Sequence, residues 1–355
     1  MTDCIFRVAT CKTQGKRKMQ EDACGFRSLG DNFQSQGETG AEASSDRFIL
    51  VLADGMGGHA GGARASNTAT SVFLEEYVGS SGLIRSRLQR ALERCNSSIK
   101  DIVTRHPELA GMGCTLVGVS LEDGMMRWVS VGDSLLYLIR RDRSIRRLNE
   151  DHSMLPVLNQ MVQRGEMSAA DAEQHPHRNA LRSALTGEPV QLVDLPEEAS
   201  EIDTEDWIIM GSDGLLTLSD GQIVETVDRW SRMGPTAVAK ALIAGIDGQH
   251  RPNQDNATVI VIHAESNCAP TEKLVSSKET EPVRWWRLYM LGIAAVVAAV
   301  LLLGFMFTED TTNNNPLKQD AAAQNSSNSK SSDWITMTVS GPGKQEPPGH
   351  LPGDP

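Results

Sequence analysis

Four aspartates of the chain each stand at one end of an apolar run. Asp54 follows FILVLA, Asp133 follows WVSVG and Asp213 follows WIIMGS, while Asp255 lies shortly before TVIVI. Carboxylates that meet at neighbouring strand ends repel one another strongly unless cations neutralise them. Any single Asp of this kind is more often a turn former or a helix cap. The fourfold repetition indicates a cation site, and the spacing alone leaves open whether the four ends meet in space.

The residue types around these aspartates favour phosphoryl chemistry. Oxygen ligands without clustered thiolates or imidazoles favour Mg²⁺ or Mn²⁺, and a pair of such ions can activate a water and hold a phosphoryl oxygen. Glu21 and Asp22 either add ligands or form an exposed acidic turn. Arg17 either binds a phosphate dianion through its planar fork or belongs to a solvated basic patch with Lys16 and Lys18.

The elements that must position these residues follow from the apolar patterns. Strands are predicted at 48–53, 126–131, 207–210 and 258–262, and helices at 63–78, 86–105, 156–165 and 236–245. Turn signals at 123–124 and 140–144 indicate two hairpins, whereas 30–45 is polar and predicted to be a surface loop. Because the strands come in hairpin groups rather than in strict alternation with helices, we expect an α+β domain.

The overall charge limits the classes of partner. The formal net charge of the 355 residues is −12, and no basic block stands out. This disfavours nucleic-acid binding, so any phosphate chemistry needs local positive charge from metals or from a placed arginine. The six cysteines are scattered without CxxC spacing, which is typical of reduced thiols in a reducing compartment.

One segment has the length and composition of a membrane span. Residues 288–307 carry no charge and match the roughly 20 residues that cross a bilayer, although a buried core helix is the alternative. Arg284 and Arg287 precede the segment, so the positive-inside rule places the N-terminal part in the cytoplasm. We therefore expect a single-pass protein of the inner (cytoplasmic) membrane, with a cytoplasmic domain at 1–265, a juxtamembrane linker at 266–287, a transmembrane helix at 288–307 and a disordered extracytoplasmic tail at 308–355. The tail is either a spacer or a ligand-binding sensor.

Seven motifs in register resemble the metal-dependent protein phosphatases of type 2C, in their bacterial form. They are GKRKMQEDA (15–23), LADGMGGHAGG (52–62), GCTLVG (113–118), VGDS (131–134), EDHS (150–153), IIMGSDGL (208–215) and DNATVIVI (255–262). The resemblance covers about residues 5–263 and includes a flap-like region at 162–187. It implies a central antiparallel β-sandwich flanked by helices on both sides, in four α/β/β/α layers, and activity on phosphoserine and phosphothreonine.

The resemblance also implies a role for each matching residue. Arg17 would bind the substrate phosphate, Asp54 would bridge two ions, and Asp133 with Asp213 would hold a weaker third ion. A water shared by two ions would attack phosphorus in line, without a phosphoenzyme. The substrates of such an enzyme would be proteins that a cognate serine/threonine kinase has phosphorylated. The full set of implied Mn²⁺ or Mg²⁺ ligands is Glu21, Asp22, Asp54, Gly55 (through its carbonyl), Asp133, Asp213 and Asp255.

A few positions depart from the family pattern. Met56 stands where animal members carry a histidine proposed as general acid, and Met cannot donate a proton. His59 either takes part in proton transfer or only packs in its loop, and a metal-bound water is a further candidate for the proton donor. Gln20 replaces a common asparagine and Leu135 replaces a frequent arginine. None of these changes removes a metal ligand.

Two alternative functions compete with this interpretation. Residues 132–135 spell GDSL, the motif of a family of serine esterases, in which Ser134 would be the nucleophile and His250 the base. That family places the motif near the N-terminus, and the strand-end aspartates would stay unexplained. The second alternative is a non-catalytic regulator that binds phosphoproteins on the same fold, and the complete set of aspartates argues against it.

Overall fold

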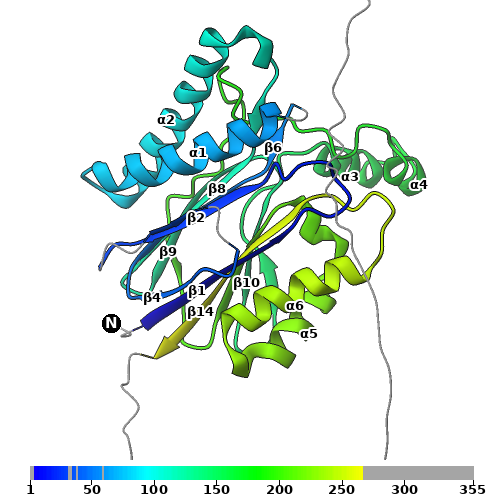
Figure 1. Cartoon of the computed structure of the whole chain (residues 1–355). Coiled ribbons are helices and arrows are strands. Elements are labelled where there is room, and N and C mark those ends of the chain that lie inside the picture. Colours follow the sequence, from blue (N-terminus) through cyan, green and yellow to red (C-terminus); the bar gives the residue numbers. More distant parts are fainter. Residues whose placement is uncertain (1–3, 31–33, 37–38, 58–59, 267–355) are drawn as a thin grey trace, which may run out of the picture. The chain divides into compact units, whose positions relative to one another are not determined.

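A computed structural model of the chain describes residues 4–30, 34–36, 39–57 and 60–266 (Figure 1). The chain divides into two units, residues 1–273 and 274–355. The predicted span at 288–307 and the predicted tail at 308–355 lie outside the described residues, as does the predicted linker apart from Ser266. None of the described helices combines the length and the apolar character that a membrane crossing requires.

Two six-stranded sheets form the centre of the described unit, and every strand pair in them is antiparallel. The first sheet has the spatial order β11 (Ile145–Arg147), β10 (Leu135–Ile139), β13 (Trp207–Gly211), β14 (Ala257–Ser266), β1 (Cys4–Thr13) and β4 (Glu42–Ser45). The second has the order β12 (Ser200–Glu201), β9 (Met125–Val131), β8 (Leu116–Glu122), β5 (Phe48–Ala53), β2 (Ala23–Ser28) and β3 (Gln34–Gln36). A separate ribbon pairs β6 (Gly55–Met56) with β7 (Gly113–Cys114).

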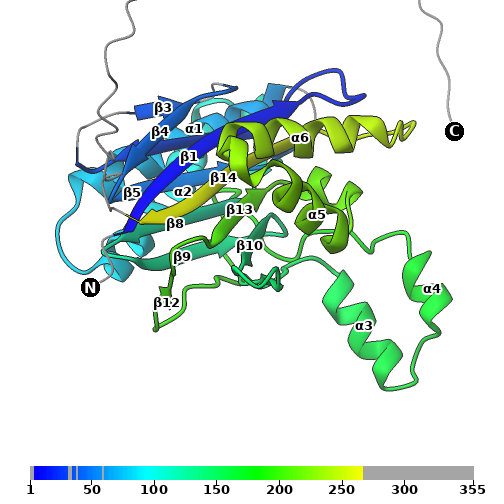
Figure 2. The same ribbon diagram turned by 90° about the horizontal axis from the view of Figure 1, so that it is seen from below.

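Helices cover the outer faces of both sheets. The pair α1 (Ala60–Gly79) and α2 (Ile84–Arg105) packs on the second sheet, and the pair α5 (Asp220–Trp230) and α6 (Pro235–Gly248) packs on the first (Figure 1). The shorter helices α3 (Leu155–Gln163) and α4 (Ala169–Glu173) lie beyond one end of the sheets (Figure 2). Short 3₁₀ turns occur at Pro107–Leu109, Asp213–Thr217 and Ser231–Met233. The predicted α+β class is confirmed.

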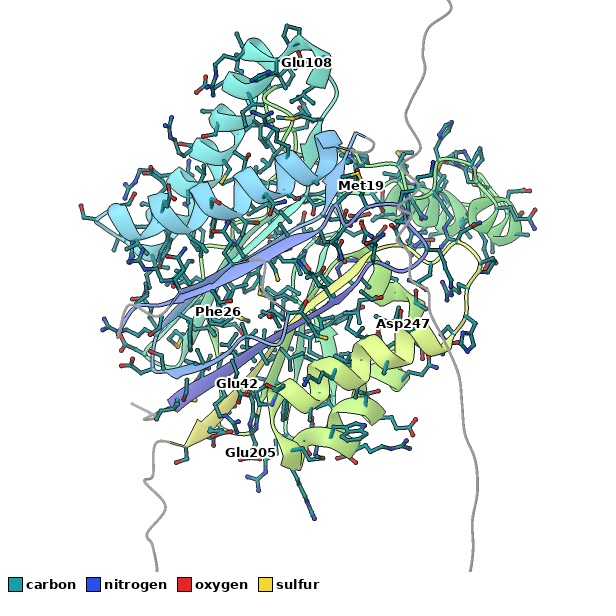
Figure 3. The ribbon with its side chains drawn as sticks, in the orientation of Figure 1. Met19, Phe26, Glu42, Glu108, Glu205 and Asp247 are labelled. Carbon is teal, nitrogen blue, oxygen red and sulfur yellow. The ribbon has the colours of Figure 1, made fainter. Side chains whose placement is uncertain are left out.

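The apolar strands form the core because both of their faces are buried. On β5, Leu50 and Leu52 point between the two sheets, whereas Ile49 and Val51 point toward α1 and α2. Phe26 of β2, labelled in Figure 3, belongs to the layer between the sheets. Burying one such side chain fully contributes about 1.5–3 kcal/mol. Successive side chains of a strand point to opposite faces, and both faces of β5 are buried. Every position of FILVLA is therefore apolar.

The hairpin at 123–124 follows the prediction, and the loop at 30–45 does not. Asp123 and Gly124 have φ angles of 55° and 73°, as a two-residue turn with left-handed residues requires, and they join β8 to β9. The predicted surface loop is wrong in part, because it contains β3 and β4 at the edges of the two sheets. Their sequences, QSQ and EASS, are short and polar, so they carry no apolar alternation.

Candidate active site

The strand register brings the predicted site residues to one end of the sandwich. Thr13 of β1 pairs with Ala257 of β14, and Ala23 of β2 pairs with Ala53 of β5. The segments that follow or precede these residues therefore leave the sheets at the same end. Figure 3 shows Met19, in the loop between β1 and β2, at this end of the domain, and Glu205 at the opposite end.

A cavity of 670 Å³ opens at this end, and seven of the eight predicted site residues line it. The eighth, Asp22, lies behind the cavity wall with 3% of its surface exposed. The Ser212 hydroxyl donates a hydrogen bond of 2.7 Å to one oxygen of the Asp22 carboxylate. The seven lining residues are Arg17, Glu21, Asp54, Gly55, Asp133, Asp213 and Asp255.

Backbone contacts fix the segment that carries Asp54 and Gly55. The Thr115 hydroxyl accepts a hydrogen bond of 2.9 Å from the Asp54 N–H, and the Thr115 N–H donates one of 2.8 Å to the Asp54 carbonyl. The Gly55 N–H donates to the Glu21 carbonyl at 3.2 Å. A Cβ on Gly55 would lie 2.3 Å from the Gly62 carbonyl oxygen, so only glycine allows the backbones to approach this closely.

Asn256 holds the β1–β2 loop, which carries Arg17 and Glu21. Its side-chain oxygen accepts a hydrogen bond of 2.8 Å from the Glu21 N–H. Its amide nitrogen donates to the carbonyls of Gln14, at 2.9 Å, and Met19, at 3.0 Å. Asn256 is 4% exposed, so it connects the start of β14 to the loop inside the protein. The sequence interpretation did not identify it as a site residue, although it stands next to Asp255.

Gln20 is a second support of the same loop. Its amide donates a hydrogen bond of 3.0 Å to the Thr13 carbonyl, and its oxygen accepts one of 3.0 Å from the Asp22 N–H. The amide group common to Gln and Asn side chains supplies both contacts. The departure from the family pattern at this position therefore keeps the turn between β1 and Asp22.

The loop that carries Asp133 is held from β11 and from the segment that follows it. Gly132 has a φ of 102°, which a residue with a Cβ adopts only under strain. The Arg147 guanidinium donates a hydrogen bond of 2.9 Å to the Asp133 carbonyl. The His152 N–H donates to the Gly132 carbonyl at 3.1 Å, and its ring Nδ1 accepts from the Gly132 N–H at 3.2 Å. Hydrogen bonds to the Gly132 N–H, the Gly132 carbonyl and the Asp133 carbonyl thus hold the backbone that carries the Asp133 side chain.

The same loop argues against the esterase interpretation. Ser134 has no exposed surface, and its hydroxyl is engaged with the Thr115 hydroxyl at 2.7 Å. His250, the base in that interpretation, lies just beyond the C-terminal end of α6. Within the described ranges, no hydrogen bond joins Ser134 to His250, and a nucleophilic serine needs such a base.

Arg17 projects from the β1–β2 loop into the cavity. Its side chain is 55% exposed, and its guanidinium forms an ion pair with the Asp255 carboxylate. The hydrogen bond to Asp255 raises the pKa of Arg17 above its usual range, so this side chain keeps its positive charge throughout the physiological range.

Burial and mutual repulsion shift the titration of the acidic residues. Burial, followed by the charge of Asp22, raises the pKa of Asp54 well above its usual range. Burial also raises the pKa of Asp22 to about 6, against the opposing hydrogen bond from Ser212. The pKa of Asp133 rises to about 6 through burial and the charge of Asp151, and that of Asp213 rises to about 7 through burial and the charge of Asp133. Ionisation of these carboxyl groups is thus disfavoured, because they are buried and lie close to one another.

The donor set fits a hard divalent cation. One buried oxygen of Glu21 and one of Asp22 have no hydrogen-bond partner, and the remaining predicted donors are carboxylate or carbonyl oxygens, which Mg²⁺ and Mn²⁺ prefer. As the side chains stand, no group of three or more His, Cys, Asp or Glu residues in the described part of the chain is arranged to hold a metal. His59, the candidate proton donor, lies outside the described residues.

Comparisons with known proteins show the family of the chain. A family model described as "Protein phosphatase 2C" matches residues 24–242. The serine/threonine phosphatase stp of Listeria innocua is 30% identical over 219 residues, which cover 60% of this chain and 83% of that protein. The serine/threonine protein phosphatase PstP of Mycobacterium tuberculosis is 32% identical over 218 residues, which cover 60% of this chain and 40% of that protein.

A solved structure has the same fold. It contains the catalytic domain of the serine/threonine protein phosphatase PstP in complex with two manganese ions. The two structures match with a TM-score of 0.57 and 26% sequence identity, over 74% of this chain and 100% of that chain. Because the family model covers more than half of the chain, the resemblance seen in the sequence motifs is confirmed. The chain belongs to the protein phosphatase 2C family and is a serine/threonine phosphatase.

Proposed function

We propose that the chain is a manganese- or magnesium-dependent phosphatase that hydrolyses phosphoserine and phosphothreonine in proteins through direct attack of a water on phosphorus. The observation that carries this proposal is the presence of Asp54, Asp213 and Asp255, from three separate parts of the chain, in one cavity with Arg17. The similarity to PstP, whose structure is described with two manganese ions, supports the choice of metal.

The acidic residues would act as the metal ligands. Rotations of the side chains that line the cavity would bring their oxygens toward common cations, whose positive charge would offset the repulsion between these carboxylates. Bound cations would lower the pKa of a shared water and polarise the phosphoryl oxygens. Asp133 with Asp213 would serve a third, weaker ion. The proposed ligand set is Glu21, Asp22, Asp54, Gly55, Asp133, Asp213 and Asp255.

Arg17 would bind the phosphate group of the substrate. Its guanidinium presents paired N–H donors that match two phosphate oxygens. In the structure these donors face Asp255, so an Asp255 carboxylate engaged by a cation would leave the guanidinium to the substrate. The Asp255 contact also orients the arginine toward the cavity before the substrate arrives.

The proposal is tested by phosphatase assays on the purified full chain with a phosphoserine peptide. We expect turnover that depends on Mn²⁺ or Mg²⁺, disappears with a chelator and returns when the metal is added back. Asp54→Asn and Asp213→Asn should each abolish it. Chelator-resistant turnover would favour the esterase interpretation, and metal binding without turnover would favour a phosphoprotein-binding regulator.

We further propose that residues 288–307 anchor the enzyme in the inner (cytoplasmic) membrane as a single span, with the catalytic domain in the cytoplasm. The support is the uncharged 20-residue run and the arginines at 284 and 287. Phosphoproteins made by a cognate serine/threonine kinase in the same compartment are the proposed substrates. Residues 308–355 would form the extracytoplasmic tail.

Membrane fractionation tests this topology. The full chain should stay in the membrane pellet after an alkaline wash, whereas a chain that ends at residue 287 should be soluble. Protease added to intact inverted vesicles should digest the catalytic domain, because that domain faces outward there. Release of the full chain by the alkaline wash, or a protected catalytic domain, would contradict the proposal.

A further inference from the structure

Arg182 is the second arginine that lines the active-site cavity, besides Arg17. Its side chain is exposed. The Arg17 guanidinium is engaged by Asp255. By contrast, the Arg182 guanidinium makes no ion pair or hydrogen bond with any residue in the described ranges, where Arg182 forms its hydrogen bond through the backbone N–H. An arginine that faces a cavity rich in carboxylates and still stays unpaired has its donors available to a ligand.

The chain around Arg182 is held on one side by the loop that carries Asp133. The Arg182 N–H donates a hydrogen bond of 2.8 Å to the His152 carbonyl, and the His152 N–H donates one of 3.1 Å to the Gly132 carbonyl. Leu181 also forms a β-bridge with Ser153. Arg182 therefore has a fixed place relative to the backbone of a proposed metal ligand.

The β6–β7 ribbon holds the chain on the C-terminal side of Arg182. Leu185 exchanges two backbone hydrogen bonds with Cys114, of 3.0 and 2.9 Å. Cys114 in turn pairs with Gly55, the neighbour of Asp54. Between these two connections, the Ser183 hydroxyl donates to the Leu192 carbonyl at 2.8 Å and accepts from its N–H at 3.0 Å. Little backbone entropy is then left to lose when a ligand binds at Arg182.

The cavity is large enough for more than the phosphate that is hydrolysed. Its volume of 670 Å³ falls within the roughly 300–1,000 Å³ of sites that enclose whole small molecules. Arg17 and Arg182 come from different parts of the chain, the β1–β2 loop and the segment after α4. Once cations neutralise the carboxylates, these two guanidinium groups are the positive side chains that remain among the described residues of the cavity lining.

We propose that Arg182 forms a second anion subsite, which binds an acidic group of the phosphoprotein close to the phosphate that Arg17 holds. The acidic group is either the carboxylate of a neighbouring Asp or Glu or a second phosphate, because a planar guanidinium fork binds both in the same way. This inference rests on the proposed function and adds the substrate class to it: phosphorylated segments with further negative charge beside the phosphoresidue.

The test compares phosphopeptides that differ only in flanking charge, with the full chain and Mn²⁺. One series carries Glu at successive positions on both sides of the phosphoserine, a second carries another phosphoserine, and the reference carries Gln. For the wild-type chain, the ratio of kcat/KM for the best acidic peptide to that for the Gln peptide should be about three- to tenfold, the size of a partly exposed charge-assisted hydrogen bond. The Glu and phosphoserine series show which of the two acidic groups the subsite prefers.

Substitutions at position 182 decide whether this arginine causes the preference. In Arg182→Gln the ratio should fall to about one, and Arg182→Glu should prefer a peptide with flanking Lys over one with flanking Glu. Arg146→Gln is the matched control, because Arg146 is exposed on β11 and lines none of the described cavities; its ratio should equal that of the wild type.

Two outcomes would overturn the inference. One is a wild-type ratio of one, and the other is an acidic preference that persists in Arg182→Glu. In both cases metal-dependent hydrolysis of the Gln peptide would still support the proposed function, so the two proposals can fail separately. Loss of hydrolysis of every peptide by the wild-type chain would instead reject the proposed function itself.

Discussion

Replacing Asp213 by Asn should stabilise the metal-free protein at neutral and alkaline pH. The carboxylate is half-buried among other acidic groups, and its pKa rises from 3.8 to about 7. A group with a raised folded-state pKa binds its proton more tightly in the folded chain than in the unfolded chain. The free energy of unfolding therefore falls as the pH rises from about 4 to about 7, and the full cost is present above that window. Asn is neutral and removes the cost.

The structure sets the size of this effect. A shift of about three pKa units corresponds to at most about 4 kcal/mol. Asp133, Asp255 and Asp22 contribute to the same shift, and the charge is shared among coupled groups. We therefore expect Asp213→Asn to raise the free energy of unfolding by about 2 kcal/mol at pH 8 and by clearly less at pH 5.

Urea unfolding of the compact unit, residues 1–273, in the presence of a chelator measures this difference. Asp101→Asn, on the exposed face of α2, controls for the loss of one negative charge and should behave the same at both pH values. With saturating Mn²⁺ the order should reverse, because the wild type gains about 2.7 kcal/mol at a metal concentration one hundred times Kd. A metal-free Asp213→Asn protein that is no more stable than the wild type at pH 8 would refute the reasoning.

Four further substitutions test the site. Arg17→Ala should raise KM for a phosphopeptide about tenfold, while calorimetry shows a smaller change in Mn²⁺ affinity; an unchanged KM would remove Arg17 from phosphate binding. Asp133→Ala should lower kcat in a way that excess Mn²⁺ does not fully restore, and wild-type turnover would argue against a third ion. Asn256→Ala removes three hydrogen bonds in a buried position, so it should cost about 2–3 kcal/mol in urea unfolding; a loss below about 1 kcal/mol would show that the loop is held by other contacts. Ser134→Ala should keep metal-dependent turnover, and its abolition with the fold intact would revive the esterase interpretation.

The sequence predicted the residues whose signal is local. An apolar run followed by an aspartate is visible within a few positions, so Asp54 and Asp213 could be assigned to strand ends before their convergence was known. The Asp123–Gly124 hairpin has an equally local signal. By contrast, β3 and β4 are polar strands whose pairing depends on neighbours elsewhere in the chain, so the polar composition of 30–45 predicts a loop.

The supporting residues could not be identified from spacing. Asn256 contacts Glu21 across 235 positions, and Thr115 contacts Asp54 across 61 positions. Each acts through a hydrogen bond to a distant backbone group, and an isolated Asn or Thr in a sequence carries no mark of such a partner. The same holds for Arg182, whose place in the cavity depends on the contacts of Leu181 with Ser153 and of Leu185 with Cys114.

The place of β14 has a consequence for the timing of synthesis. This strand, the last one in the described part of the chain, pairs with both β13 and β1, along all ten residues of β1, and Asp255 and Asn256 precede it directly. A nascent chain that ends before residue 255 lacks a central strand, a proposed metal ligand and the residue that holds the Arg17 loop. Premature termination should therefore yield no partially active phosphatase, and dephosphorylation should begin only after nearly the whole domain has left the ribosome.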